Sequence, residues 1–263
     1  MKTRVWVAGG LFAAVLASAP AGSQPAPPGV TGYLAAGAAP SSLALLPPPP
    51  APRSKALARD KESMRAALAL HGGPRWALAT EDADLTFPAA AGTFSCAVGA
   101  PITEADTPKL YGLLRRTLLD IGRSTAPTKQ KYKRPRPFTV NHAPQCTPAF
   151  DAVLRGDGAY PSGHAALGWG WSLIVAEAAP DRADAVLARG RAFADSRRIC
   201  NVHWLSDTEE GRTMGAAVVA RLHADPAFAA DLAAARAELA AARAKALPPT
   251  RDCAKEAAQL AAG

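Results

Sequence analysis

The amino-acid sequence predicts an all-α fold, a single-domain helical bundle. Several segments carry apolar residues at the three- and four-residue spacing of a helix, and no segment shows sustained alternation with period two. With 263 residues, 49% of them hydrophobic, the chain is long enough for one sizeable core and hardly long enough for two. We therefore expect one helical domain over residues 53–246, followed by a C-terminal tail over residues 247–263.

The N-terminus has the three parts of a secretory signal peptide, over residues 1–23. Lys2 and Arg4 precede an apolar run from Val5 to Ala17, and small residues follow, with cleavage expected at positions 19–23. An uncleaved membrane anchor is the alternative, but the run is short for a bilayer-spanning helix, and no other stretch approaches that length. The sequence thus predicts a periplasmic or secreted protein without a membrane span after signal cleavage.

Residues 24–52 form a proline-rich arm that includes four consecutive prolines, Pro47 to Pro50. Such a run favours polyproline II, so this arm cannot supply a core element of its own. Two alternatives stay open: a disordered arm, or an extended strap laid over the domain or over a neighbouring subunit. The sequence also leaves open whether the protein is a homodimer or a higher homo-oligomer.

Helical patterning begins near Arg53 and is clearest from Thr107 to Gly122. There Thr107 is the expected N-cap, Pro108 lies in the first turn and Gly122 marks the end. Its apolar face consists of Leu110, Leu113, Leu114, Leu118 and Ile121. This pattern predicts an amphipathic helix.

The stretch from Ser162 to Ala178 is apolar on nearly every side, as expected for a helix at the centre of a bundle. Further helices are expected from Arg182 to Arg198, from about Asp207 to His223, and from Pro226 to Lys245.

Four cysteines in a chain expected to be exported favour two disulfide bridges, although three pairings are possible. The cysteines are Cys96, Cys146, Cys200 and Cys253. We favour a bridge from Cys96 to Cys146 and another from Cys200 to Cys253. No CxxC pair or zinc-finger histidine spacing occurs, so we expect no structural metal.

The chain is basic, with 30 basic and 22 acidic residues and a net charge of +8. Without Lys2 and Arg4, 28 basic residues face 22 acidic ones, a net charge of +6. The basic residues are not interleaved with aromatic ones in a stripe, so we expect no nucleic-acid partner. Several of them converge instead on three short motifs, which favours attraction of small anionic substrates.

The three motifs lie within about eighty residues and contain chemistry-bearing side chains at fixed spacing. The first runs from Lys129 to Pro137, the second from Pro161 to His164, and the third from Ser196 to Asp207. Their candidate site residues are Lys129, Arg134, Arg136, Ser162, Gly163, His164, Arg197, His203 and Asp207. This set can hold a phosphate and attack it.

In order and spacing, the motifs resemble the signature of the phosphatidic-acid-phosphatase-type/vanadium haloperoxidase superfamily. Within that superfamily the chain is similar to the class A bacterial non-specific acid phosphatases, also at Ser42–Leu46, Ala79–Asp84 and Gly158–His164. Ala165 departs from the threonine that usually follows the histidine. The resemblance implies a helical bundle and a metal-independent acid phosphatase, EC 3.1.3.2, with no cofactor.

Lys129, Arg136 and Arg197 would compensate the charge on the phosphoryl oxygens, and Arg134 would support them from behind. Pro161-Ser162 reads as a helix start whose free N–H groups bind anions. Gly163 would let the backbone approach closely. A plain serine N-cap is the alternative for Ser162.

His203 and Asp207 are four residues apart, which puts them on one face if the segment is helical. A carboxylate on one imidazole nitrogen frees the other to attack phosphorus. The resemblance assigns the same roles: His203 forms a phosphohistidine, Asp207 orients it, and His164 serves as general acid and base. His71, His142 and His223 match no motif.

The sequence therefore predicts hydrolysis of diverse phosphate monoesters to an alcohol and inorganic phosphate, with inhibition by vanadate and a phosphotransferase side activity. One alternative is a vanadium-dependent haloperoxidase, because vanadate mimics the phosphoryl transition state. Another is a non-catalytic exported phosphate-binding protein, but binding alone needs neither a nucleophile nor an acid.

Overall fold

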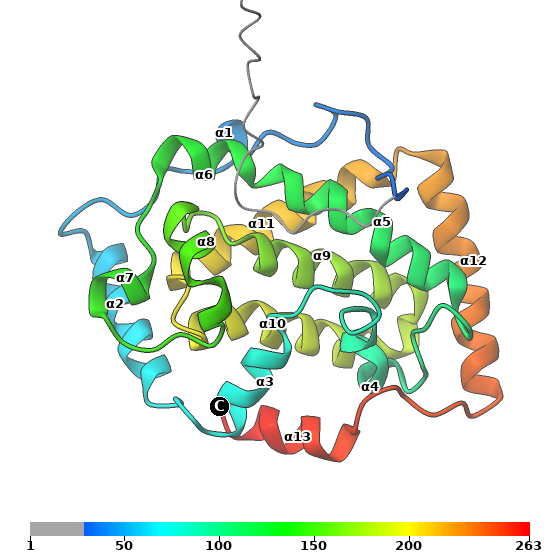
Figure 1. Ribbon diagram of the computed structural model, residues 1–263. Helices are drawn as coiled ribbons and strands as arrows, with labels where there is room; N and C mark the ends of the chain where they lie inside the picture. The colour runs from blue at the N-terminus through cyan, green and yellow to red at the C-terminus, as the bar shows by residue number, and fades with distance from the viewer. Residues whose placement is uncertain (1–28) are drawn as a thin grey trace, which may run out of the picture.

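A computed structural model describes residues 29–263 and is helical throughout, as the sequence predicts (Figure 1). No strand occurs in this part of the chain. The expected signal peptide lies outside the described residues. The α-helices are α1 (Ser42–Leu45), α2 (Lys55–Leu68), α3 (Pro74–Glu81), α4 (Ser95–Val98), α5 (Pro108–Ser124), α6 (Ala126–Tyr132), α7 (Pro137–Asn141), α8 (Asp151–Gly156), α9 (Gly163–Ala178), α10 (Ala183–Ile199), α11 (Leu205–Leu222), α12 (Pro226–Ala244) and α13 (Cys253–Ala261).

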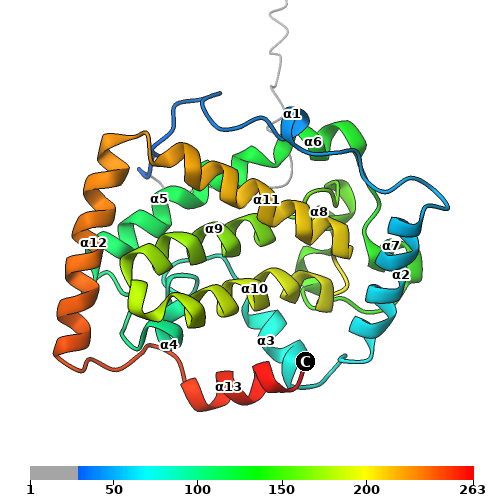
Figure 2. The same ribbon diagram turned by 180° about the vertical axis from the view of Figure 1, so that it is seen from behind.

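Helix α9 runs through the middle of the bundle and packs against α5, α10 and α11, while α12 crosses one end (Figures 1 and 2). Its uniformly apolar sequence follows from this position, because neighbours cover it on several sides. Trp171 is fully buried, and its indole N–H donates to Leu114 O at 3.1 Å and to Thr117 Oγ1 at 3.2 Å. Of the helices between residues 29 and 263, none is long and apolar enough to cross a membrane.

Two glycines on α11 let it approach α9 closely. A Cβ at Gly211 would lie 2.5 Å from Ser162 O, and one at Gly215 would lie 2.3 Å from Ala166 O. Any larger side chain would push the two helices apart. The close approach brings the start of α11 beside the start of α9, where Ser162 N donates to Asp207 O at 2.9 Å.

The longest expected helices are confirmed by α5, α9, α10, α11 and α12, each within about two residues of its predicted ends. Helix α5 continues past Gly122 to Ser124. The tail over residues 247–263 contains α13, which the sequence analysis does not predict and which packs against α3.

Residues 29–52 of the proline-rich arm lie across the domain as a strap. Tyr33 N donates to the buried carboxylate of Asp120 at 2.8 Å, and the Tyr33 hydroxyl donates to Asp231 at 2.7 Å. Farther along, Pro47 O accepts from the Tyr160 hydroxyl at 2.7 Å. These contacts correspond to the strap alternative.

The predicted disulfide pairing is wrong. The bridges join Cys96 to Cys253 and Cys146 to Cys200, with Cα–Cα distances of 5.4 and 4.8 Å. The prediction paired the cysteines in sequence order. It is wrong because α13 returns to the side of the bundle formed by α3 and α4, and α4 contains Cys96. Cys253 therefore ties the C-terminal segment to α4 rather than to the third motif.

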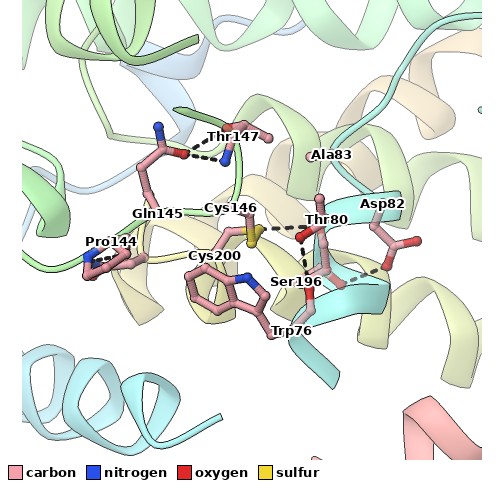
Figure 3. Close-up of a disulfide and its surroundings, with 12 residues drawn as sticks. Trp76, Thr80, Asp82, Ala83, Pro144, Gln145, Cys146, Thr147, Ser196 and Cys200 are labelled. Atoms are coloured by element: carbon pink, nitrogen blue, oxygen red, sulfur yellow. Dashed lines mark hydrogen bonds between the residues drawn. A yellow bond between two sulfur atoms is a disulfide. The ribbon is translucent and has the colours of Figure 1, made fainter. Parts of the chain in front are cut away.

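The other bridge is drawn in Figure 3, where Cys146 meets Cys200 at the end of α10. The loop before Cys146 reaches this place because Asn201 Nδ2 donates to Ala143 O at 3.2 Å and to Pro144 O at 3.1 Å. Cys146 N also donates to Cys200 O at 3.3 Å. This bridge fixes the backbone three residues before His203.

Candidate active site

All three motifs meet at the end of the bundle where α9 and α11 begin and α10 finishes (Figures 1 and 2). The first motif spans α6 and the turn to α7, the second leads into α9, and the third joins α10 to α11. Helix ends converge here, so their free backbone groups and the motif side chains surround one place.

Lys129 and Arg136 are held together by a carboxylate that the sequence analysis did not single out. Asp157 Oδ2 lies 2.9 Å from Lys129 Nζ and 2.9 Å from Arg136 Nη2. Lys129 Nζ also donates to Gly158 O at 2.5 Å. The signal for Asp157 was its position directly before the Gly158–His164 segment.

Burial and the neighbouring charge of Arg136, opposed by Asp157, together lower the pKa of Lys129 to about 8. The ammonium is therefore charged at neutral and acidic pH and loses its proton through the range around pH 8. Only 11% of its side chain is exposed, so this charge faces the interior of the site.

Arg197 is buried, and within the described residues its Nε and Nη1 have no hydrogen-bond partner. Burial and the charge of Arg136, opposed by Asp82, together lower its pKa to about 9. Leaving charged donors buried and unpaired is costly. An anion bound at this place would satisfy them.

The imidazole of His203 has a different partner on each nitrogen. Nδ1 lies 3.4 Å from Asp207 Oδ2, and Nε2 lies 2.9 Å from Arg136 Nη1. Because the guanidinium can only donate, Nε2 carries the lone pair and Nδ1 carries the proton. Burial, followed by the charges of Arg136, Lys129 and Arg197, lowers the pKa of His203 well below its usual value, which keeps the ring neutral.

His203 and Asp207 do not share a helical face, because α11 begins only at Leu205. The turn at Trp204 brings them together instead, with Asp207 Oδ2 accepting from Trp204 N at 2.8 Å. Arg134 contacts Asp207 on the side away from His203, and its Nη1 is 2.5 Å from Asp207 Oδ1. Burial raises the pKa of Asp207 to about 6, against the opposing charge of Arg134.

At the start of α9, Ser162 is the N-cap: its Oγ accepts from Ala165 N at 3.2 Å. A Cβ at Gly163 would meet only Thr125 Oγ1, at an ordinary 3.5 Å, so the protein itself does not require glycine there. His164 Nε2 lies 3.1 Å from Ala83 O, to which it donates. This contact leaves Nδ1 of His164 available.

Burial lowers the pKa of His164 well below its usual value, and Arg197 adds to the effect, while the bond to Ala83 opposes it. The site thus combines two neutral imidazoles with three cations. No cluster of three or more His, Cys, Asp or Glu side chains suited to a metal ion occurs in residues 29–263.

Comparison with known proteins identifies the family to which the three motifs belong. A sequence profile described as the PAP2 superfamily matches residues 110–229. The non-specific acid phosphatase of Salmonella typhimurium is 43% identical over 195 residues, which cover 74% of this chain and 78% of that protein.

The acid phosphatase of Zymomonas mobilis is 40% identical over 211 residues, covering 79% of this chain and 78% of its own length. The non-specific acid phosphatase of Providencia stuartii is 39% identical over 209 residues, covering 79% and 84%. The chain accordingly belongs to the PAP2 superfamily and, within it, to the family of the bacterial non-specific acid phosphatases.

Proposed function

We propose that this protein is an acid phosphatase that hydrolyses phosphate monoesters through a phosphohistidine on His203, without a metal. The observation that carries the proposal is the buried guanidinium of Arg197, whose Nε and Nη1 have no hydrogen-bond partner within residues 29–263. The same site holds Lys129, Arg136 and a neutral imidazole. Relatives named acid phosphatases cover most of the chain, and they support the same activity.

In the first step, the phosphoryl group of the ester binds between the three cations. Its oxygens supply the acceptors that Arg197 lacks, and they replace His203 Nε2 as the acceptor for Arg136 Nη1. The lone pair of Nε2 then faces phosphorus. Phosphoryl transfer needs chiefly this positioning and charge compensation.

Nε2 attacks phosphorus, and the ester P–O bond breaks with its electron pair on the alcohol oxygen. His164 protonates that oxygen, although burial and the neighbouring cations by themselves lower its pKa. Since three of the causes of that low pKa are Arg197, Arg136 and Lys129, the bound phosphate dianion offsets them and raises the pKa of His164. Substrate binding thus lets His164 hold the proton that it delivers.

In the second step, His164 takes a proton from water, the oxygen attacks phosphorus, and the bond to Nε2 breaks. An alcohol in place of water would accept the phosphoryl group, which is the phosphotransferase side activity. Orthovanadate would inhibit because it adopts the geometry of the transition state.

The central test is His203→Ala, assayed with p-nitrophenyl phosphate and with a labelled ester in a reaction stopped with alkali and detergent, because the N–P bond of phosphohistidine hydrolyses in acid. We expect turnover and the alkali-stable phosphoenzyme to disappear together, because the nucleophile is absent. Labelled phosphoenzyme in the variant would assign the nucleophile elsewhere. EDTA should leave the wild-type activity unchanged, and its loss, with recovery on adding a divalent metal, would overturn the metal-independent mechanism.

A haloperoxidase is not favoured, since the relatives that cover most of the chain are acid phosphatases. A vanadate-loaded sample tested with halide and peroxide would reveal that activity. We further propose that the protein is exported, on the strength of the expected signal peptide and two disulfide bridges.

A further inference from the structure

Asp60 belongs to α2, nearly seventy residues before the first motif, and has no part in the mechanism above. Its side chain is only 1% exposed. Oδ1 accepts from Ser206 N at 2.8 Å, and Oδ2 accepts from Ser206 Oγ at 2.7 Å and from Arg134 Nη2 at 2.6 Å. The carboxylate is thereby attached to the first turn of α11, one residue before Asp207.

Arg134 consequently lies between two buried carboxylates. Its Nη1 donates to Asp207 and its Nη2 donates to Asp60. If Asp207 were the only anion beside Arg134, the pair would present almost no net charge to His203. With Asp60 added, the three groups together carry one net negative charge beside the imidazole, in a buried region where charge is weakly screened.

We propose that Asp60 is a positioning residue for phosphoryl transfer: it pairs with Arg134 and thereby leaves Asp207 free to act as an anion toward His203. The proposal rests on the proposed function, in which His203 is the nucleophile. As Nε2 bonds to phosphorus and the alcohol leaves, the ring of His203 gains positive charge while Nδ1 keeps its proton. An anion at Nδ1 stabilises that charge, so Asp60 favours the attack without touching substrate.

The position of Asp60 beside Arg134 and Asp207 also predicts how kcat depends on pH. Charged or titratable groups around Asp207 come from several elements: Arg134 and Arg136 after α6, Lys129 in α6, Asp60 in α2, Tyr160 before α9, and His203 before α11. Asp60 raises the pKa of Asp207, so removing its charge lowers that pKa. When the charge of Asp60 is removed, the fall of kcat on the acid side of its pH profile should therefore move to lower pH. The maximum value of kcat should decrease as well.

The experiment compares Asp60→Asn with Asp120→Asn in the full-length protein. Asp120 is a matched control, because it is a buried aspartate like Asp60. It accepts two backbone N–H groups of the strap and does not contact the site. For D60N we expect kcat to fall about 10- to 100-fold, the range seen when partners behind a site histidine are removed. The inhibition constant for inorganic phosphate should stay unchanged, and D120N should keep the wild-type kcat.

Two further variants separate charge from structure. Ser206→Ala removes a hydrogen bond from Asp60 and another from Arg134 but keeps both charges, so its acid limb should stay in place. In an Arg134→Gln background, D60N should cause no further loss, because the cation that Asp60 balances is gone.

The proposal is overturned if D60N keeps the wild-type kcat, loses phosphate affinity in step with kcat, or loses as much activity in the R134Q background. A shifted acid limb in S206A would also overturn it, even if D60N did not fold. Labelled phosphoenzyme in the wild type distinguishes this failure from a failure of the mechanism. If wild-type His203 carries no label, the proposed function is wrong; if it does and D60N behaves like D120N, only the role of Asp60 is wrong.

Discussion

Helix α10 carries two buried arginines, Arg189 and Arg197, two helical turns apart and in opposite situations. Arg189 forms ion pairs with Asp82 and Glu256, with Nη2 2.6 Å from Asp82 Oδ1, and these partners raise its pKa despite burial. Arg197 has no such partner on Nε or Nη1 in the described chain, and its pKa is lowered to about 9. Arg189 is therefore ion-paired within the fold, although its Nε, 3.3 Å from Glu256 Oε2, forms no hydrogen bond within the described residues. For Arg197, we propose that a bound anion supplies the partner.

The comparison separates structure from function at the level of single side chains. Both residues are arginine, both are almost completely buried, and both lie on one helix. What differs is whether the described part of the chain places a carboxylate within ion-pair distance, as it does for Arg189 and does not for Arg197. A buried cation without its own carboxylate lowers stability, and its presence is best explained by an anion that the site is built to bind.

The largest effect should come from Arg197→Met. We expect kcat/KM for p-nitrophenyl phosphate to fall by roughly 10³-fold or more, the scale at which an arginine contributes to phosphoryl transfer. The free energy of unfolding, measured with urea, should stay the same or increase, because an unpaired buried charge is removed. A large loss of stability in this variant would show that Arg197 stabilises the fold, as Arg189 does.

Arg189→Met should do the opposite. Breaking a buried ion pair on one side typically costs about 3–5 kcal/mol of folding stability. Without Arg189, Asp82 and Glu256 are left with the longer contacts to Arg251, whose Nη1 lies 3.8 Å from Asp82 Oδ1 and 3.6 Å from Glu256 Oε2. The protein that remains folded should keep most of its kcat. The double variant Asp82→Leu/Arg189→Met should recover part of the loss, and failure to recover any would mean that the pair has another role.

The stabilisation of the folded protein by inorganic phosphate should depend on Arg197 and not on Arg189. At a concentration 100 times its Kd, phosphate should raise the unfolding free energy of the wild type by about 2.7 kcal/mol. Arg189→Met should show a similar increase above its lower baseline, and Arg197→Met should show none at the same concentrations. Thermal unfolding with and without phosphate measures this, with sulfate as a second anion. Equal stabilisation of all three proteins would place phosphate away from Arg197.

The smallest effect concerns Asp157, which raises the pKa of Lys129. In Asp157→Asn this support is lost, so Lys129 should lose its charge at lower pH than the wild-type value of about 8. We expect the alkaline limb of kcat/KM to move down by about one pH unit. Asp151→Asn is the control, because it removes an exposed ion pair with Arg155. An unmoved limb would mean that Lys129 does not set it.

The sequence singled out Arg197 but not Arg189. Arg197 could be found because it belongs to a motif with fixed spacing, whereas Arg189 is one arginine among several in α10. Helical spacing also predicted α5, because burial of one face leaves a periodic pattern in the chain. A run that is apolar on nearly every side predicted α9, because that helix is covered on several sides.

The remaining features depend on tertiary contacts that no spacing records. Asp60 lies between Arg59 and Lys61, in a stretch that looks like the polar face of a surface helix. Only the packing of α2 against α11 makes it a buried partner of Arg134. The disulfide pairing was mispredicted for a similar reason: the return of α13 toward α4 is a property of the bundle and not of the distance along the chain.

The bridge between Cys96 and Cys253 encloses all three motifs in one covalent ring. If a protease cuts any single peptide bond between these two cysteines, the resulting fragments stay joined. Such a nicked molecule would run as one species without reductant and separate into two only when reduced. The chain between Cys96 and Cys253 can thus be cut once without any motif being released from the rest of the protein.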